Sequence, residues 1–108
     1  MTSYRLIWSP VAREDLAVII DYIADDSVGN AERVLRRLEH RAQALTRFPQ
    51  RGRAVPELRR GGIAGHLEII EPPWRLLYTI AGLEVHIVAV LDGRRQLHDL
   101  LLDRFLRQ

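Results

Sequence analysis

Hydrophobic positions recur at two different spacings along the chain, and the change of spacing separates helices from strands. Alternating apolar residues predict a strand from Tyr4 to Trp8. From about Pro10 to Asp26 the apolar residues return every three or four positions, which predicts a helix with one broad face on the core. Ser9 and Pro10 are typical of the cap and the first position of such a helix.

A second helix is predicted after Gly29-Asn30, with Asn30 as its cap and a single apolar stripe that ends before Phe48-Pro49. The short link from Ser27 to Asn30 predicts that the two helices form an antiparallel hairpin. The Gly- and Arg-rich stretch 51–65 follows without a predicted helix or strand.

The remaining pattern is that of strands joined by short turns and closed by one more helix. The predicted strands run from Leu67 to Glu71, from Trp74 to Ile80 and from Glu84 to Leu91, and the last helix from Arg95 to Arg107. The expected fold is α+β, in the order β-α-α-β-β-β-α, with the last three strands as an antiparallel meander. A length of 108 residues with 47% hydrophobic residues predicts one domain over residues 1–108.

The strand and helix phases place several side chains. Arg75 and His86 are predicted on the open face of the sheet, and Tyr78 on the opposite side from Arg75. On the first helix, Val11 and Val18 form with Tyr22 a second apolar stripe, turned by roughly 130° from the core-facing one. A stripe that this small core does not need favours a groove covered by a partner chain.

Charge is concentrated in one segment. All 16 basic residues are Arg, the net charge is +2, and residues 47–66 carry five Arg against one Glu. This pattern favours an acidic partner or a local phosphate contact over a dedicated duplex-binding surface.

Several kinds of chemistry are not indicated. There is no Cys, the four His are dispersed, and no phosphate-binding or nucleophile-elbow motif occurs, so neither a metal nor another cofactor is expected. The longest apolar runs, such as Ile87 to Leu91, are far shorter than the ~20 residues that span a membrane. No signal peptide is evident. The protein is expected to be soluble and cytoplasmic.

One catalytic scheme has candidates for each role: metal-free RNA cleavage by a base, a cation and an acid. Glu68 or His86 would be the base, Arg75 the cation, and Tyr78 or His98 the acid. The predicted strand phases weaken this scheme, because Tyr78 and Arg75 lie on opposite sides of the sheet.

The order and spacing of several short motifs resemble the RelE/ParE superfamily of bacterial toxins from type II toxin-antitoxin pairs. The matching residues are Ser9-Pro10-Val11-Ala12, Asp15-Leu16, Ile19, Tyr22-Ile23, Leu45, Phe48-Pro49, Gly52-Arg53, Glu57-Leu58-Arg59, Trp74-Arg75-Leu76-Leu77-Tyr78, Val88 to Val90 and Asp92-Gly93-Arg94-Arg95. The predicted element order agrees with the fold of that superfamily.

The resemblance implies one of two activities. RelE-like members cut mRNA on the ribosome, with basic residues and a Tyr or His near the C-terminus, for which Arg75, His86 and His98 are the candidates here. ParE-like members poison DNA gyrase and need no active site of their own. The lack of Tyr after Leu91, the lack of Lys and the Gly93-Arg94-Arg95 ending look more like ParE, so gyrase is the expected target.

The resemblance also implies a ParD-like antitoxin whose tail folds over the toxin, and sequence-specific DNA binding is expected only through that antitoxin. The expected antitoxin contacts are Val11, Val18, Tyr22, Arg51 and Arg53. The expected target contacts are Arg59, Arg60, Arg75, Arg94 and Arg95. Two alternatives stay open: a ribosome-dependent nuclease, and a non-toxic binding module of the same fold.

Overall fold

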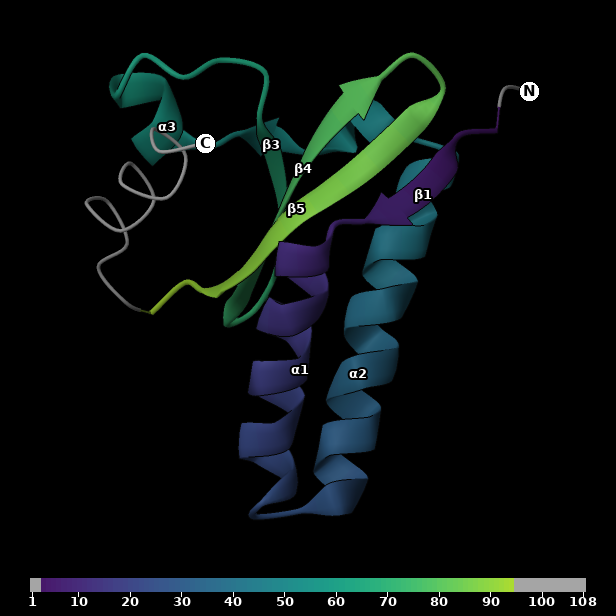
Figure 1. Cartoon of the computed structure of the whole chain (residues 1–108), viewed down its shortest axis with the longest axis vertical. Coiled ribbons are helices and arrows are strands. Elements are labelled where there is room, and N and C mark those ends of the chain that lie inside the picture. The colour runs from purple at the N-terminus through teal and green to yellow at the C-terminus, as the bar shows by residue number, and fades with distance from the viewer. Residues whose placement is uncertain (1–2, 95–108) are drawn as a thin grey trace.

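The computed structural model describes residues 3–94, in which a helical hairpin packs on one face of a five-stranded sheet (Figure 1). The helices and strands are β1 (Arg5–Trp8), α1 (Pro10–Ala24), α2 (Val28–Gln43), β2 (Arg53–Ala54), α3 (Pro56–Arg60), β3 (Leu67–Glu71), β4 (Trp74–Ala81) and β5 (Glu84–Asp92). Short 3₁₀ turns at Ala44–Thr46 and Pro49–Arg51 connect α2 to β2. The α+β architecture predicted from the sequence is confirmed, whereas the helix predicted from Arg95 to Arg107 lies outside the described residues.

The hairpin is set by two serine caps. Ser9 Oγ accepts a hydrogen bond from the Ala12 backbone N–H at 3.0 Å, as its position before Pro10 predicts. The cap predicted at Asn30 is wrong. Ser27 caps α2 instead, because its Oγ accepts from the Asn30 N–H at 3.1 Å, and the second helix therefore begins at Val28.

The sheet has the strand order β1-β5-β4-β3-β2. β3, β4 and β5 form the predicted antiparallel meander, and β1 pairs with β5 in parallel, with Trp8 opposite Ile87. Between the pairs Leu77–Ala89 and Tyr78–Ile87, β5 contains one extra residue, which is a β-bulge.

The segment 53–60, predicted without regular structure, forms β2 and α3. Arg53 and Ala54 pair with β3, and Pro56 starts the short helix that follows. The apolar side chains on either side of Pro56 explain why this segment folds onto the sheet: Val55 and Leu58 are buried against the face opposite the hairpin.

The sheet thus has an apolar cluster on each face. The larger one lies between the sheet and the hairpin and includes Leu38, Leu76, Tyr78 and Ile87. The smaller one joins Val55, Leu58, Leu77, Ala89 and Leu91. The predicted strand phases are therefore confirmed, but the face predicted to be open is covered by α3 at the end that carries Arg75.

Candidate functional site

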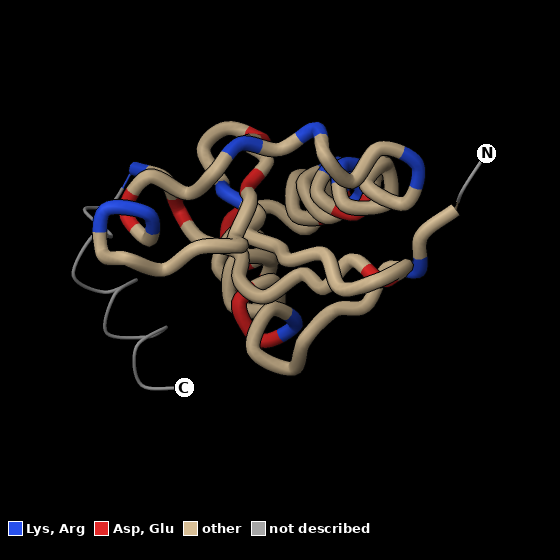
Figure 2. Tube along the Cα trace, turned by 90° about the horizontal axis from the view of Figure 1, so that it is seen from above, with Lys and Arg blue, Asp and Glu red and all other residues tan. Residues whose placement is uncertain are grey.

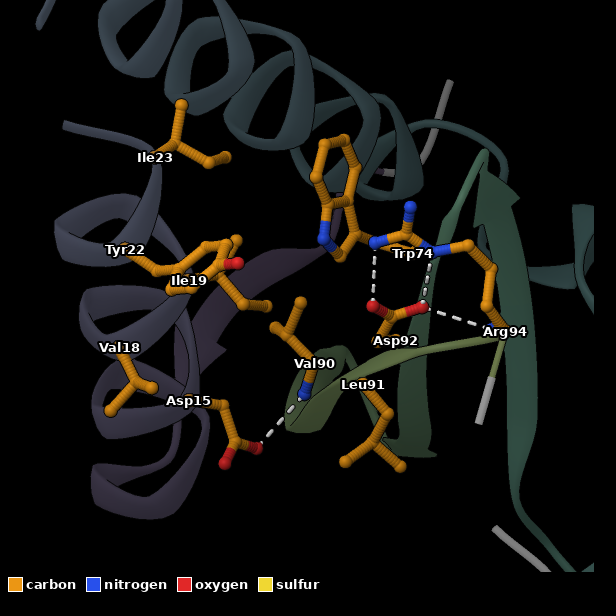
Figure 3. A pocket seen from close by; sticks show the side chains of 10 residues that line it. All are labelled: Asp15, Val18, Ile19, Tyr22, Ile23, Trp74, Val90, Leu91, Asp92 and Arg94. Carbon is orange, nitrogen blue, oxygen red and sulfur yellow. Dashed lines mark hydrogen bonds and ion pairs between the residues drawn. The ribbon is translucent and has the colours of Figure 1, made fainter. Parts of the chain in front are cut away.

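A groove of about 510 Å³ runs between α1 and the end of β5 (Figure 3). Apolar side chains form most of its lining, and an ion pair between Asp92 and Arg94, 2.8 Å long, stands at one end. Its lining residues are Asp15, Val18, Ile19, Tyr22, Ile23, Trp74, Val90, Leu91, Asp92 and Arg94.

The predicted exposed stripe of α1 forms one wall of this groove. Val18 is 60% exposed and Tyr22 80% exposed, and their spacing of four residues makes them neighbours on one helix face, so they form a joint exposed patch. Val11 is also exposed but is not among the lining residues. These side chains face solvent because other residues of α1, such as Ala12 and Leu16, form the face that packs on the core.

Sequence reasoning missed the opposite wall of the groove. Trp74 and Val90 come from neighbouring strands, and only the pairing of β4 with β5 brings them beside α1. Asp15 could have been found, because it precedes Val18 and Tyr22 by three and seven residues and so falls on the same helical stripe.

The Arg residues predicted to bind antitoxin lie elsewhere. Arg51 stacks its guanidinium over the Phe48 ring at 5.3 Å from the centroid. The Nε of Arg53 donates a hydrogen bond to Glu68 at 2.8 Å. Neither residue lines the groove, so the structure does not bring together the five predicted antitoxin contacts.

On the other face of the sheet, Arg75 is the centre of a buried ionic network. Its Nε donates to Glu68 at 2.7 Å, and its two terminal nitrogens donate to both oxygens of Glu57, at 2.5 and 2.8 Å. Arg75 is 8% exposed and Glu68 1% exposed. The bidentate pair links α3 to β4, the central strand of the sheet, because Glu57 lies in the first turn of α3.

The network shifts the pKa values of Glu57 and Arg75. The hydrogen bond from Arg75 is the main cause that lowers the pKa of Glu57 from 4.5 to about 2. The same contact raises the pKa of Arg75 above its usual value, although burial opposes the shift. Both groups are therefore charged throughout the physiological pH range.

The prediction that Arg75 lies on an open surface is therefore wrong. The strand phase was correct, but α3 covers this part of the sheet and two carboxylates occupy the guanidinium. Of the other predicted target contacts, Arg59 and Arg60 are exposed at the end of α3 and Arg94 is exposed beside Asp92. Arg95 lies outside the described residues.

Among the described candidate nuclease residues, Glu68 and Arg75 are in contact, whereas Tyr78 and His86 lie apart from them. Tyr78 is buried on the hairpin side, where its hydroxyl donates to the Pro49 carbonyl at 2.6 Å and accepts from the Gly52 N–H at 3.0 Å. Burial raises the pKa of Tyr78. His86 shares a face of the sheet with Arg75, but its pairing partner on β4 is Thr79. Thr79 is four residues from Arg75, which is about 13 Å along the strand. His98 lies outside the described residues.

Charge and metal-ligand patterns add little. The basic positions are distributed over several elements of the described chain (Figure 2). Within residues 3–94, His, Asp and Glu form no group of three that could hold a metal ion. No helix in that range is long and apolar enough to cross a membrane.

Comparison with known proteins identifies related toxins. Toxin RelE2 of Caulobacter vibrioides is 34% identical over 92 residues, which are 84% of this chain and 97% of that protein. Toxin ParE3 of the same organism is 33% identical over 88 residues, 82% of this chain and 84% of that protein.

Two solved structures have the same fold. One is described as the chromosomal ParDE toxin-antitoxin system from P. aeruginosa, with a TM-score of 0.69 at 19% identity, covering 85% of this chain and 98% of that chain. The other is the toxin-antitoxin complex RelBE2 from Mycobacterium tuberculosis, with a TM-score of 0.65 at 26% identity, covering 85% and 93%.

A family model described as the ParE toxin of the type II toxin-antitoxin system parDE matches residues 6–97. This range includes the helical hairpin, the Arg75 network and the whole meander. The chain therefore belongs to the ParE toxin family of type II toxin-antitoxin systems, within the RelE/ParE superfamily.

Proposed function

We propose that this toxin acts in the cytoplasm by binding DNA gyrase and stabilising its cleaved complex with DNA, without an active site of its own. The observation that supports the proposal is that other side chains already bind the guanidinium of Arg75. A cation that stabilises a cleaving phosphate must reach it, whereas the guanidinium of Arg75 is buried and bound by Glu57 and Glu68.

The positions of the other candidates support the same conclusion. Glu68, the candidate base, is buried and accepts from two Arg side chains. Tyr78, the candidate acid, holds the Pro49 carbonyl on the other side of the sheet. Within residues 3–94, a base, a cation and an acid are therefore not assembled around one surface position.

A ParD-like antitoxin is the proposed partner of the groove between α1 and β5. The two structural relatives are complexes of a toxin with an antitoxin. The groove offers what a folding tail requires: an apolar floor with Trp74 and Val90, two exposed anchors in Val18 and Tyr22, and an ion pair at one end.

A paired assay of the purified chain tests the target. One reaction contains gyrase and supercoiled plasmid, and the other contains ribosomes programmed with mRNA. Linear DNA that appears only when gyrase is present supports the proposal. Cut mRNA with intact plasmid would establish the nuclease instead and would require that α3 move away from Arg75. Activity in neither reaction, together with unimpaired growth on induction without antitoxin, would indicate a non-toxic binding module.

A further inference from the structure

The outer face of α2 carries a basic row that the charge count along the sequence does not reveal. Arg33, Arg36, Arg37, His40 and Arg41 line a shallow hollow of about 530 Å³ together with Glu71 of β3. The four basic side chains Arg33, Arg36, Arg37 and His40 are exposed, and Arg41 is partly buried. The opposite side of α2 is buried in the core through Ala31, Val34, Leu38 and Ala42, so the orientation of the basic row is fixed.

Acidic side chains neutralise this row only in part. Glu71 lies 3.6 Å from the Nε of Arg37 and 3.4 Å from that of Arg41. The two acids of α2, Glu32 and Glu39, are turned by about 100° or more from Arg33 around the helix, at 3.6 residues per turn. The exposed pair between Arg36 and Glu32 is 4.0 Å long and contributes little.

The lining of the hollow favours a polyanion over a peptide. Protein partners are held mainly by apolar or aromatic anchors in a desolvated centre. The groove between α1 and β5 has such anchors, whereas the described residues that line the α2 hollow are all charged or polar. A polyanion needs only exposed cations, because release of its counterions supplies the binding free energy.

The spacing of the row suits a phosphate backbone. Arg33 and Arg37 are exposed and lie four residues apart, which places them about 6 Å apart along the helix axis. Arg41 continues the row at the same interval, although one of its terminal nitrogens donates to the Ile70 carbonyl. Duplex DNA carries one negative charge per ~1.7 Å of its axis, so several phosphates lie within reach of the row. Guanidinium groups bind phosphate through two parallel hydrogen bonds.

We propose that the basic row of α2 binds the phosphate backbone of duplex DNA without reading its sequence. The choice of DNA as the polyanion rests on the proposed function, since a toxin bound to cleaving gyrase lies next to duplex DNA. In that complex α2 would contact the DNA while the rest of the toxin contacts the enzyme. The contact is separate from the groove proposed for the antitoxin, which involves α1 and the strands.

The test measures binding of the purified toxin to a labelled DNA duplex of about 20 base pairs, without gyrase, over a range of salt concentrations. The variant Arg33→Gln/Arg37→Gln removes two charges from the row. The control Arg13→Gln/Arg47→Gln removes two exposed charges elsewhere. All four side chains are exposed, so both variants should fold, which their melting temperatures verify.

We expect the row variant to bind DNA roughly tenfold more weakly at low salt and to reduce the slope of log affinity against log salt by about 2. The control should change affinity less than about threefold. Equal weakening in both variants would overturn the proposal, because it would show an effect of net charge alone. Absence of DNA binding by the unmodified toxin would also overturn it.

Two further arms identify the polyanion. Tighter binding of an RNA duplex of the same length, or more effective competition by a poly-glutamate peptide, would overturn the assignment to DNA. Since none of these reactions contains gyrase, the result is independent of whether the toxin poisons that enzyme. A toxin that binds DNA through α2 but leaves gyrase unaffected would contradict the proposed function alone.

Discussion

The carboxylate of Asp15 accepts a hydrogen bond from the backbone N–H of Val90 at 3.0 Å, so a side chain of α1 caps the edge of β5 (Figure 3). β1 pairs with β5 only as far as Ile87 and leaves the rest of that edge open. At the other edge of the meander, Arg41 of α2 donates to the Ile70 carbonyl at 2.9 Å. Charged side chains at open strand edges disfavour pairing with another chain. The hairpin therefore protects both edges of the meander.

Replacing Asp15 should loosen the capped edge. In Asp15→Ala we expect faster hydrogen exchange at the Val90 amide and a loss of about 1 kcal/mol of unfolding free energy, because the N–H loses its partner. Asp15→Asn keeps an acceptor oxygen and should lose less. Equal exchange rates at Val90 in all three proteins would show that the contact does not protect the edge.

Tyr22 should contribute strongly to antitoxin binding. It is 80% exposed in the groove, and aromatic anchors of this kind dominate protein interfaces, so Tyr22→Ala should weaken binding by about 2 kcal/mol while the melting temperature stays constant. Leu83→Ala is the matched control, because Leu83 is 60% exposed in the turn between β4 and β5. Titration calorimetry with the antitoxin measures both. Unchanged affinity in Tyr22→Ala would remove α1 from the interface.

Stability should depend on pH through Glu57. Because Arg75 lowers the folded-state pKa of Glu57 to about 2 from 4.5, its contribution is fully present above pH 4.5 and is lost as the pH falls toward 2. A shift of this size corresponds to at most about 3 kcal/mol of unfolding free energy.

Chemical denaturation at a series of pH values measures this contribution. Glu57→Gln should be less stable at neutral pH and should show a flatter profile between pH 4.5 and 2. The control Glu14→Gln, at an exposed position of α1, should follow the unmodified protein. If Glu57→Gln retains the full pH dependence, the bidentate pair is not its source.

The hydroxyl of Tyr78 should be essential for the packing of the segment after α2. Tyr78→Phe removes the partners of the Pro49 carbonyl and the Gly52 N–H, which should reduce the unfolding free energy by about 1–3 kcal/mol. Gly52→Ala should also destabilise, because a Cβ at Gly52 would lie 2.3 Å from the Tyr78 hydroxyl and 2.7 Å from the Glu68 carbonyl. Thermal unfolding of both variants and of the double mutant measures the coupling. Strictly additive effects would contradict a shared contact.

Replacement of Arg75 should affect the stability of the fold, whereas replacement of Arg59 and Arg60 should affect the action on the target. Arg75→Met removes the guanidinium that joins the buried Glu68 to the partly buried Glu57 and should lower stability by about 3 kcal/mol. Arg59→Gln/Arg60→Gln changes exposed side chains and should reduce gyrase-dependent DNA cleavage several-fold at constant melting temperature. Full cleavage activity in the Arg59→Gln/Arg60→Gln protein would exclude the end of α3 from the target contact.

Periodicity alone determined most of the secondary structure. The apolar spacing predicted both long helices and the three strands of the meander, because each pattern reflects which side of an element is buried. The same phases placed Arg75 and His86 on one side of the sheet and Tyr78 on the other. The exposed stripe of Val18 and Tyr22 could likewise be identified, since a helix face that exceeds the needs of the core is visible in the sequence.

Only the tertiary structure decided what those side chains contact. The burial of Arg75 depends on Glu57, 18 residues earlier, and on a five-residue helix too short for periodicity to reveal. Counting charge along the chain did not reveal the basic row on α2. Glu32 and Glu39 balance the count for this helix, but they lie on another side of it. Local spacing specifies which face of an element is apolar, but contacts between distant segments determine which charges are neutralised and which remain at the surface.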